Sequence, residues 1–315
     1  MRLALALAFL VLSFCSALAQ DLSPRAYLIT PIHSNAINLT YSYQSGSLQF
    51  TGSTPITGAT ANIHLGLVSY YHSLSFFKRS ANFTAVLPYG IGNFQGQIKQ
   101  IPAHVYRSGL LDSQYRLAVN LKGGPAMDTR EFSQWHQTIL IGASFTLVAP
   151  TGQYDPTKLV NLGDNRWGFK PEIGFSRRWG KWLLDAYSGA WFFTTNNEYF
   201  SHNQFNPGVA TQSEKPVAEF ETHLSYDTKP WRHYKLRMWA SLDGNFWFGG
   251  QTSINGVATP GTNQRSSRLG ATAAFPYTSR QSIKVSFSDG AYVLYGGNYK
   301  NVSIGWQYTW LGRPN

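Results

Sequence analysis

Acidic and basic side chains recur at every second position along two neighbouring stretches of this chain. Glu219, Glu221 and His223 alternate with less polar residues, and Arg237 and Asp243 share one parity further on. Side chains two positions apart on an extended chain point to the same face. A face of this kind can pair charges, hold an ionic solute, or bring an acid and a base within reach of each other.

A hydrolytic enzyme is one interpretation of this chemistry. Nucleophilic catalysis needs a hydroxyl, a base and an orienting acid within hydrogen-bond reach, and Ser225, His223 and Glu221 supply those types. Spacings of two arise by chance in any polar strand face, however, and the chain contains neither a Gly-x-Ser-x-Gly elbow nor a His-Glu-x-x-His pair. We therefore expect a protein that is not an enzyme and that needs no cofactor or metal.

The elements that hold these residues are predicted to be β-strands, because hydrophobicity alternates with a period of two along most of the chain. In the last such segment, Val302, Ile304 and Trp306 share one face, and Asn301 and Ser303 share the other. We predict twelve strands, near residues 36–45, 63–77, 81–90, 109–121, 137–149, 167–178, 182–194, 216–228, 234–248, 265–276, 281–290 and 301–310.

One apolar and one polar face also fit a soluble sandwich with its apolar side inward. The predicted segments are longer than the roughly 5–6 residues usual in soluble strands and match the roughly 9–11 that a membrane-spanning strand needs. Aromatic residues such as Trp179 and Trp182 gather at segment ends, as in the girdles of membrane barrels. The predicted fold class is all-β: a transmembrane antiparallel up-and-down β-barrel of about twelve strands.

The connections between these segments alternate in length, as in bacterial barrels with short periplasmic turns and long outer loops. Those near 77–80, 178–181, 228–233 and 277–280 are short, and long loops are expected near 46–62, 91–108, 150–166, 195–215 and 249–264. The turn 122–136 is too long for this alternation. A miscounted strand there would give ten or fourteen strands in place of twelve.

Both chain ends carry features of export to an outer membrane. Met1-Arg2 precedes an apolar run and a small-x-small site at Ala17-Leu18-Ala19, so residues 1–19 are predicted to be a cleaved signal peptide and residues 20–315 a single barrel domain. Cys15 is the only cysteine, so the mature chain would have no disulfide. Residues 305–310 resemble the C-terminal Gly-x-x-aromatic-x-aromatic signal read by the barrel-assembly machinery, although five residues follow them.

The charge balance of the chain is basic but dispersed. Lys and Arg number 26 against 15 Asp and Glu, a formal net charge of +11, while charged residues make up only 13% of the chain. No single basic run is present, and export to the envelope of a Gram-negative bacterium removes nucleic acid as a partner. We expect the basic balance to meet outer-membrane lipid and lipopolysaccharide, or to favour anionic solutes.

Several stretches together resemble one family of Gram-negative proteins, that of the MetA-pathway of phenol degradation. The most specific is 152–156, Gly-Gln-Tyr-Asp-Pro, running on to 165–172, Asn-Arg-Trp-Gly-Phe-Lys-Pro-Glu; the others are 24–27, 107–110 with 120–121, 249–252, 267–270 and the last strand. Leu111 departs from the pattern, which often has Gly there. The resemblance implies an outer-membrane barrel associated with the uptake of aromatic or other hydrophobic compounds, and it brings no catalytic residues.

Charges of both signs are predicted to line the lumen, where they either brace the wall or set the selectivity of a pathway. The inward-facing set is Arg116, Lys170, Glu172, Arg178, Asp185, Glu219, Glu221, His223, Lys235, Arg237, Asp243, Arg268 and Lys284. The residues singled out as substrate- or pore-lining are Arg166, Lys170, Glu172, Glu219, Glu221, Arg237 and Asp243. Arg166 or Lys170 could pair with a substrate carboxylate or phenolate, and the competing interpretation is that 165–172 only anchors a loop.

The function predicted from these features is passive uptake of small hydrophobic or aromatic, phenol-like compounds through an outer-membrane channel. The alternative is a structural or adhesive outer-membrane barrel without transport. Large inward residues such as Trp239 and Trp247 fit either a plugged barrel or an apolar binding surface.

Overall fold

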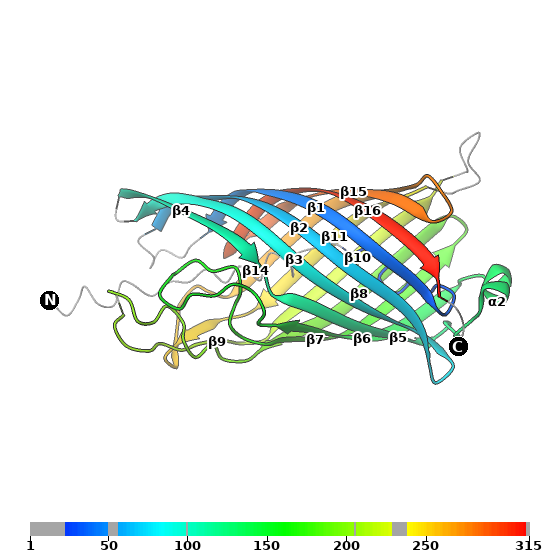
Figure 1. Cartoon of the computed structure of the whole chain (residues 1–315), viewed down its shortest axis with the longest axis horizontal. Helices are drawn as coiled ribbons and strands as arrows, with labels where there is room; N and C mark the ends of the chain where they lie inside the picture. The colour runs from blue at the N-terminus through cyan, green and yellow to red at the C-terminus, as the bar shows by residue number, and fades with distance from the viewer. Residues whose placement is uncertain (1–22, 50–55, 99, 205, 229–237, 313–315) are drawn as a thin grey trace.

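The structure is a computed structural model that describes residues 23–49, 56–98, 100–204, 206–228 and 238–312. It is a closed, antiparallel β-barrel whose strands tilt across its long axis (Figure 1). The strands of its wall are β1 (Ser34–Gln49), β2 (Ile56–Phe76), β3 (Arg79–Ile98), β5 (Ser113–Lys122), β6 (Ile139–Ala149), β7 (Gly168–Trp179), β8 (Trp182–Phe193), β10 (Val217–Asp227), β11 (Trp239–Gly249), β14 (Gln264–Pro276), β15 (Gln281–Val293) and β16 (Gly296–Leu311). The predicted signal peptide, residues 1–19, lies outside the described residues.

The wall has twelve strand positions, and the fold class predicted from the sequence is confirmed. A thirteenth strand, β4 (Ile101–Leu110), pairs with the far part of β3, while β5 pairs with the near part of the same strand. Strands β4 and β5 therefore occupy one position in succession. The barrel closes through β2–β3 pairing and through β1–β16 pairing, which joins the two ends of the described chain.

The two ends of the barrel differ. The short β2–β3, β7–β8 and β14–β15 turns, the end of the last strand and α2 (Thr129–Gln134) lie at one end, which we call the short-turn end (Figure 1). The opposite end, called the loop end, carries the long connections and a small separate sheet of β9 (Gln212–Glu214), β12 (Thr252–Ile254) and β13 (Val257–Ala258). In the part of the chain that the structure describes, no helix is long and apolar enough to cross a membrane.

The prediction of a loop is wrong for two of the connections. Where the structure describes these ranges, residues 46–49, 56–62, 91–98 and 101–108 continue strands β1 to β4 beyond their neighbours at the loop end (Figure 1). The period of two persists there, but the apolar face changes sides: Ala59 and Ala61 are buried inside the barrel, while Asn62 points outward. A search for apolar residues on a lipid-facing side does not recognise such an extension as strand.

The long turn 122–136 contains no additional pair of strands. Instead it forms α2, whose first turn is closed by a capping box between Asp128 and Glu131. The turn is tied to the β2–β3 turn, because the backbone N–H of Ala126 donates to the carbonyl of Lys78 and that of Ser80 to the carbonyl of Gly124. The strand count therefore stays at twelve.

Candidate functional site

Residues 23–33, which precede β1, lie inside the barrel, and we call them the inner segment. Tyr27 of this segment is 1% exposed. Its ring occupies a notch made by two glycines that face each other across β6 and β7, Gly142 and Gly174. A β-carbon at Gly142 would come within 2.4 Å of the Tyr27 ring, and one at Gly174 within 2.1 Å. These glycines provide the space that the aromatic ring fills.

Polar contacts tie the inner segment to the wall of β7, β8 and β10. The Arg25 guanidinium pairs with the Asp227 carboxylate, which Arg178 also contacts. The backbone N–H of Ala26 donates to the Tyr187 hydroxyl at 3.0 Å. The Tyr27 hydroxyl donates to Glu172 at 2.9 Å. The segment is thus held on one side of the lumen.

The turn 122–136 closes the base of this arrangement. Ile29 of the inner segment packs in one apolar cluster with Met127 and Leu140, and Phe132 and Trp135 pack against it. The backbone N–H of Ile32 donates to the carbonyl of Met127 at 2.8 Å. The unusual length of this turn therefore serves to hold the inner segment at the short-turn end.

A buried charge cluster surrounds Lys170 on β7. Its Nζ lies 2.9 Å from a Glu172 oxygen, 3.0 Å from Glu219 and 3.6 Å from Glu221. Glu219 also accepts hydrogen bonds from the indole nitrogens of Trp191, at 2.9 Å, and Trp247, at 3.1 Å. One ammonium facing three carboxylates is well compensated, so Lys170 already has the partners that a bound anion would otherwise supply.

A second group adjoins this cluster and joins β10, β11 and β14. The Nδ1 of His223 lies 2.8 Å from Asp243, and its Nε2 lies 3.4 Å from Glu221. Asp243 also accepts a hydrogen bond from the Thr272 hydroxyl at 2.7 Å. Because His223 and Ser225 are fully buried, no solute reaches them. The arrangement braces three neighbouring strands and does not present a nucleophile.

Beside the inner segment the lumen keeps a cavity of about 510 Å³. The segment forms one side of it, and strands β1, β2, β3, β5, β15 and β16 supply much of the other. Its lining includes apolar side chains, polar side chains and ions: Leu28, Leu67, Tyr71, Val86, Trp191 and Trp239; Asn38, Thr84, Gln114 and Gln307; and Arg25, Arg116, Lys170, Glu172, Glu221 and Lys284. A small amphipathic molecule fits this volume and lining.

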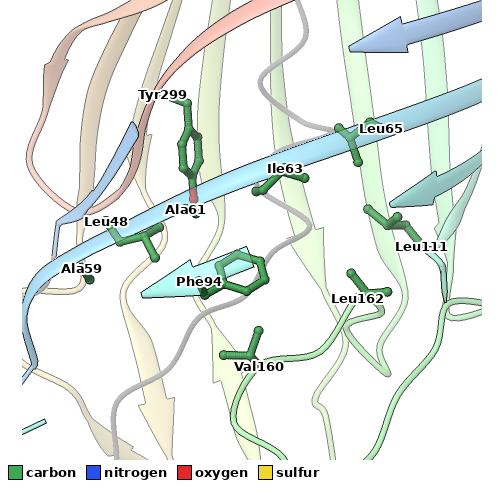
Figure 2. Close-up of a cluster of buried hydrophobic side chains, with 10 residues drawn as sticks. All are labelled: Leu48, Ala59, Ala61, Ile63, Leu65, Phe94, Leu111, Val160, Leu162 and Tyr299. Atoms are coloured by element: carbon green, nitrogen blue, oxygen red, sulfur yellow. The ribbon is translucent and has the colours of Figure 1, made fainter. Parts of the chain in front are cut away.

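At the loop end the interior is apolar (Figure 2). Strands β1, β2, β3 and β16 contribute the wall of this cluster, and residues 150–166 reach in from a loop to place Val160 and Leu162 against it. The loop is fixed by Asp112, which is fully buried and accepts the backbone N–H groups of Gly152 and Asp164, each at 2.8 Å. The loop therefore narrows the barrel above the cavity.

Arg166 follows this loop and lies apart from the Lys170 cluster. Its guanidinium pairs with Glu214 of β9 at 2.6 Å and stacks over the Phe193 ring at 4.3 Å. Burial raises the pKa of the Glu214 carboxyl above its ordinary value, and the charge of Arg166 opposes that rise. These contacts join the loop to the small sheet at the loop end.

The structure brings five of the seven predicted site residues into connected contacts: Lys170, Glu172, Glu219, Glu221 and, through His223, Asp243. Arg166 lies elsewhere, in the loop contacts with Glu214. Arg237 lies outside the described residues. Of the seven, Lys170, Glu172 and Glu221 line the cavity.

Sequence reasoning missed the inner segment. Residues 23–33 have no strand periodicity, and nothing in their composition places them inside a barrel. The facing glycines Gly142 and Gly174 were a usable signal, because two glycines in neighbouring strand segments mark a close approach. Within the described ranges, no group of three or more His, Cys, Asp or Glu side chains is placed to hold a metal ion.

Comparisons with known proteins agree with this architecture. Residues 45–302 match the model of the family described by the MetA-pathway of phenol degradation. Among solved structures, the COG4313 outer membrane channel from Pseudomonas putida F1 is 16% identical with a TM-score of 0.75, over 92% of this chain and 100% of that one. That likeness shows the fold to be that of an outer-membrane barrel.

Two further solved structures are more distant. The transport unit of the autotransporter AIDA-I from Escherichia coli is 10% identical, with a TM-score of 0.49 over 98% of this chain and 96% of that one. The CymD monoaromatic hydrocarbon channel is 6% identical, with a TM-score of 0.40 over 90% of each chain. No curated protein matches the chain.

Proposed function

The chain belongs to the family of the MetA-pathway of phenol degradation, and on that basis we propose that it is an outer-membrane channel for passive uptake of small hydrophobic or aromatic, phenol-like compounds. The observation that carries the proposal is the cavity of about 510 Å³ beside the inner segment. Its mixed apolar and polar lining suits a solute with a ring and one polar group. Lys170, Glu172 and Glu221 then belong to the wall of the route.

The route runs from the loop end, past residues 150–166, to the cavity and the short-turn end, which faces the periplasm. The apolar interior at the loop end gives a hydrophobic solute a favourable first contact. The export features accompany this proposal: residues 1–19 act as a cleaved signal, residues 20–315 form the barrel domain, the assembly machinery inserts it, and lipid and lipopolysaccharide surround it.

Uptake into proteoliposomes tests the proposal. Refolded protein is reconstituted into vesicles, and entry of radiolabelled phenol and benzyl alcohol is compared with entry of a sugar of similar mass. Because small aromatics also cross bilayers unaided, protein-free vesicles give the baseline, and single-channel recording in planar bilayers supplies a second readout. We expect conductance steps that phenolic solutes block.

A structural or adhesive barrel without transport is the alternative. The inner segment is the observation that favours it, since a segment that fills part of the lumen can block it permanently. A folded barrel, identified by heat-modifiable migration on gels, that neither conducts nor accelerates aromatic entry would establish the alternative. Faster entry of aromatic solutes than in protein-free vesicles would reject it.

A further inference from the structure

The charges that line the cavity are not evenly distributed around it. Its carboxylates, Glu172 and Glu221, lie on β7 and β10, and both contact Lys170. Arg116 pairs with Glu172 at 3.4 Å, and Arg25 pairs with Asp227. Both carboxylates of the cavity, and two of its other cations, are therefore already engaged in ion pairs.

Lys284 stands apart from that network. It lies on β15, where its side chain is exposed to the cavity, and it makes no ion pair with any carboxylate among the described residues. The strand register runs from Asp227 through Trp239 and Ala274 to Lys284. With adjacent strands about 4.8 Å apart, roughly 14 Å separates the backbones of Lys284 and Asp227.

The wall beside Lys284 carries a glycine and polar side chains. Its partner on β16 is Gly305, which has no side chain, and the next residue in the same row is Thr40 on β1. A β-carbon at position 305 would lie 2.8 Å from the Thr40 hydroxyl, so the Thr40 side chain already covers this glycine. Gln307, two positions along β16, lines the same cavity and adds an amide donor.

We propose that Lys284 is the anion-binding residue of this cavity and that the channel takes small aromatic carboxylates, with the carboxylate on the Lys284 ammonium and the ring among the apolar lining side chains. This inference rests on the proposed function and narrows its substrate class. Leu67, in the same register row, and Trp239, two strands away, supply apolar surface. A neutral phenol gains the apolar contacts only, whereas benzoate gains both.

Benzoate and benzyl alcohol make a matched pair of probes, since they differ chiefly in charge. In Lys284→Gln we expect the benzoate concentration that half-blocks the single-channel current to rise roughly fivefold. The reason is that the ion pair between the Lys284 ammonium and the benzoate carboxylate, in a solvated cavity, is lost. Block by benzyl alcohol should stay unchanged. Lys284→Arg retains the cation and should retain the wild-type response to benzoate.

Lys300→Gln is the control, because Lys300 is an exposed lysine of β16 between two inward-facing residues, Tyr299 and Asn301, and so points out of the barrel. It should leave both responses unchanged. Unaltered benzoate block in a folded Lys284→Gln channel would overturn the inference, as would benzoate that blocks the wild type no better than chloride. If Lys284→Gln does not fold, a loss of benzoate block in Lys284→Met with heat-modifiable migration intact supports it, and retention rejects it.

The two proposals fail in different ways. If benzyl alcohol enters wild-type vesicles faster than protein-free vesicles and benzoate block does not depend on Lys284, only the anion site is rejected. If neither solute enters faster, the proposed uptake itself is rejected, and the anion site with it.

Discussion

At the scale of the residue, the lumen contains two kinds of charged side chain: buried ones that form ion pairs with one another, and ones that face the cavity. Lys170 meets three carboxylates within 3.6 Å and is 8% exposed, so its environment is already that of a compensated ion. Removing one partner of a buried pair leaves the remaining charges without compensation, which costs more than an exposed pair is worth. Substitutions in the Lys170 cluster therefore test whether it stabilises the folded barrel.

Replacing Lys170 with methionine should lower the free energy of unfolding by about 3–5 kcal/mol, since Glu219 and its neighbours would be left buried without a cation. Urea unfolding of the refolded protein, followed by tryptophan fluorescence, measures this. Lys158→Met is the control, because Lys158 pairs with Asp155 in a loop where both side chains are well exposed, and about 0–1 kcal/mol is expected. Equal stability of the two variants would contradict the assignment.

The parity of these residues could be predicted from the sequence, but their partners could not. Alternation places Glu219, Glu221 and Asp243 on one face of their strands, and burial confirms that they point inward. Which inward charge meets which depends on the stagger between strands, and that is set by the closed barrel as a whole. Arg166 shares the parity of Lys170 yet pairs with β9, because the chain leaves the wall before residue 168.

At the scale of the element, the buried carboxylate of Asp112 is one anchor of the loop 150–166. Asp112 accepts two backbone N–H groups of the loop, at Gly152 and Asp164, from a point between β4 and β5 where the wall changes strands. Both groups would lose this acceptor together if the carboxylate were removed. An unpaired buried N–H costs about 1–3 kcal/mol.

Asp112→Ala should therefore release the loop while the barrel remains folded. We expect amides of residues 150–166 to exchange with deuterium faster, as read by mass spectrometry of proteolytic fragments, with the strands unchanged. Asp155→Ala is the matched variant, since among the described residues the Asp155 side chain forms its hydrogen bonds and ion pair only with Thr157 and Lys158 of its own turn. The assignment is wrong if exchange in the loop is the same in both variants.

The sequence also indicated the strands more completely than the connections. Alternation with outward apolar residues found all twelve positions, whereas the strand extensions at the loop end were missed because their apolar residues, such as Ala61 and Phe94, face the interior. The turn 122–136 was recognised as anomalous, but its reason, contact with Ile29 of a distant segment, is a tertiary one. Local patterns report which side of a strand is apolar, and not what covers it.

At the scale of the whole molecule, the inner segment decides how much of the lumen is open. Its position depends on the glycine notch that receives Tyr27, with ring atoms within 2.1 Å of where a Gly174 β-carbon would lie. Gly142 and Gly174 have backbone angles open to any residue, since neither has a positive φ. A methyl group at position 174 would act on the Tyr27 ring, whose atoms are the nearest to it.

Gly174→Ala should displace Tyr27, cost about 1–3 kcal/mol of unfolding free energy through overpacking, and raise the single-channel conductance. Recording in planar bilayers and urea unfolding measure the two effects. Gly66→Ala is the control, because the nearest atom to a β-carbon at Gly66, apart from its chain neighbours, lies 4.0 Å away. An unchanged conductance in a folded Gly174→Ala barrel would mean that the inner segment does not limit the current.

The place of Tyr27 also sets an order in time for assembly. The inner segment leads directly into β1. Each of the sixteen residues of β1 pairs with a residue of β16 that lies far from it along the chain. Contacts of such long separation are the slowest to form. We therefore expect Tyr27 to pack against β6 and β7 before the pairing of β1 with β16 is complete. The barrel would then close around the inner segment, which is already in the lumen when the wall is sealed.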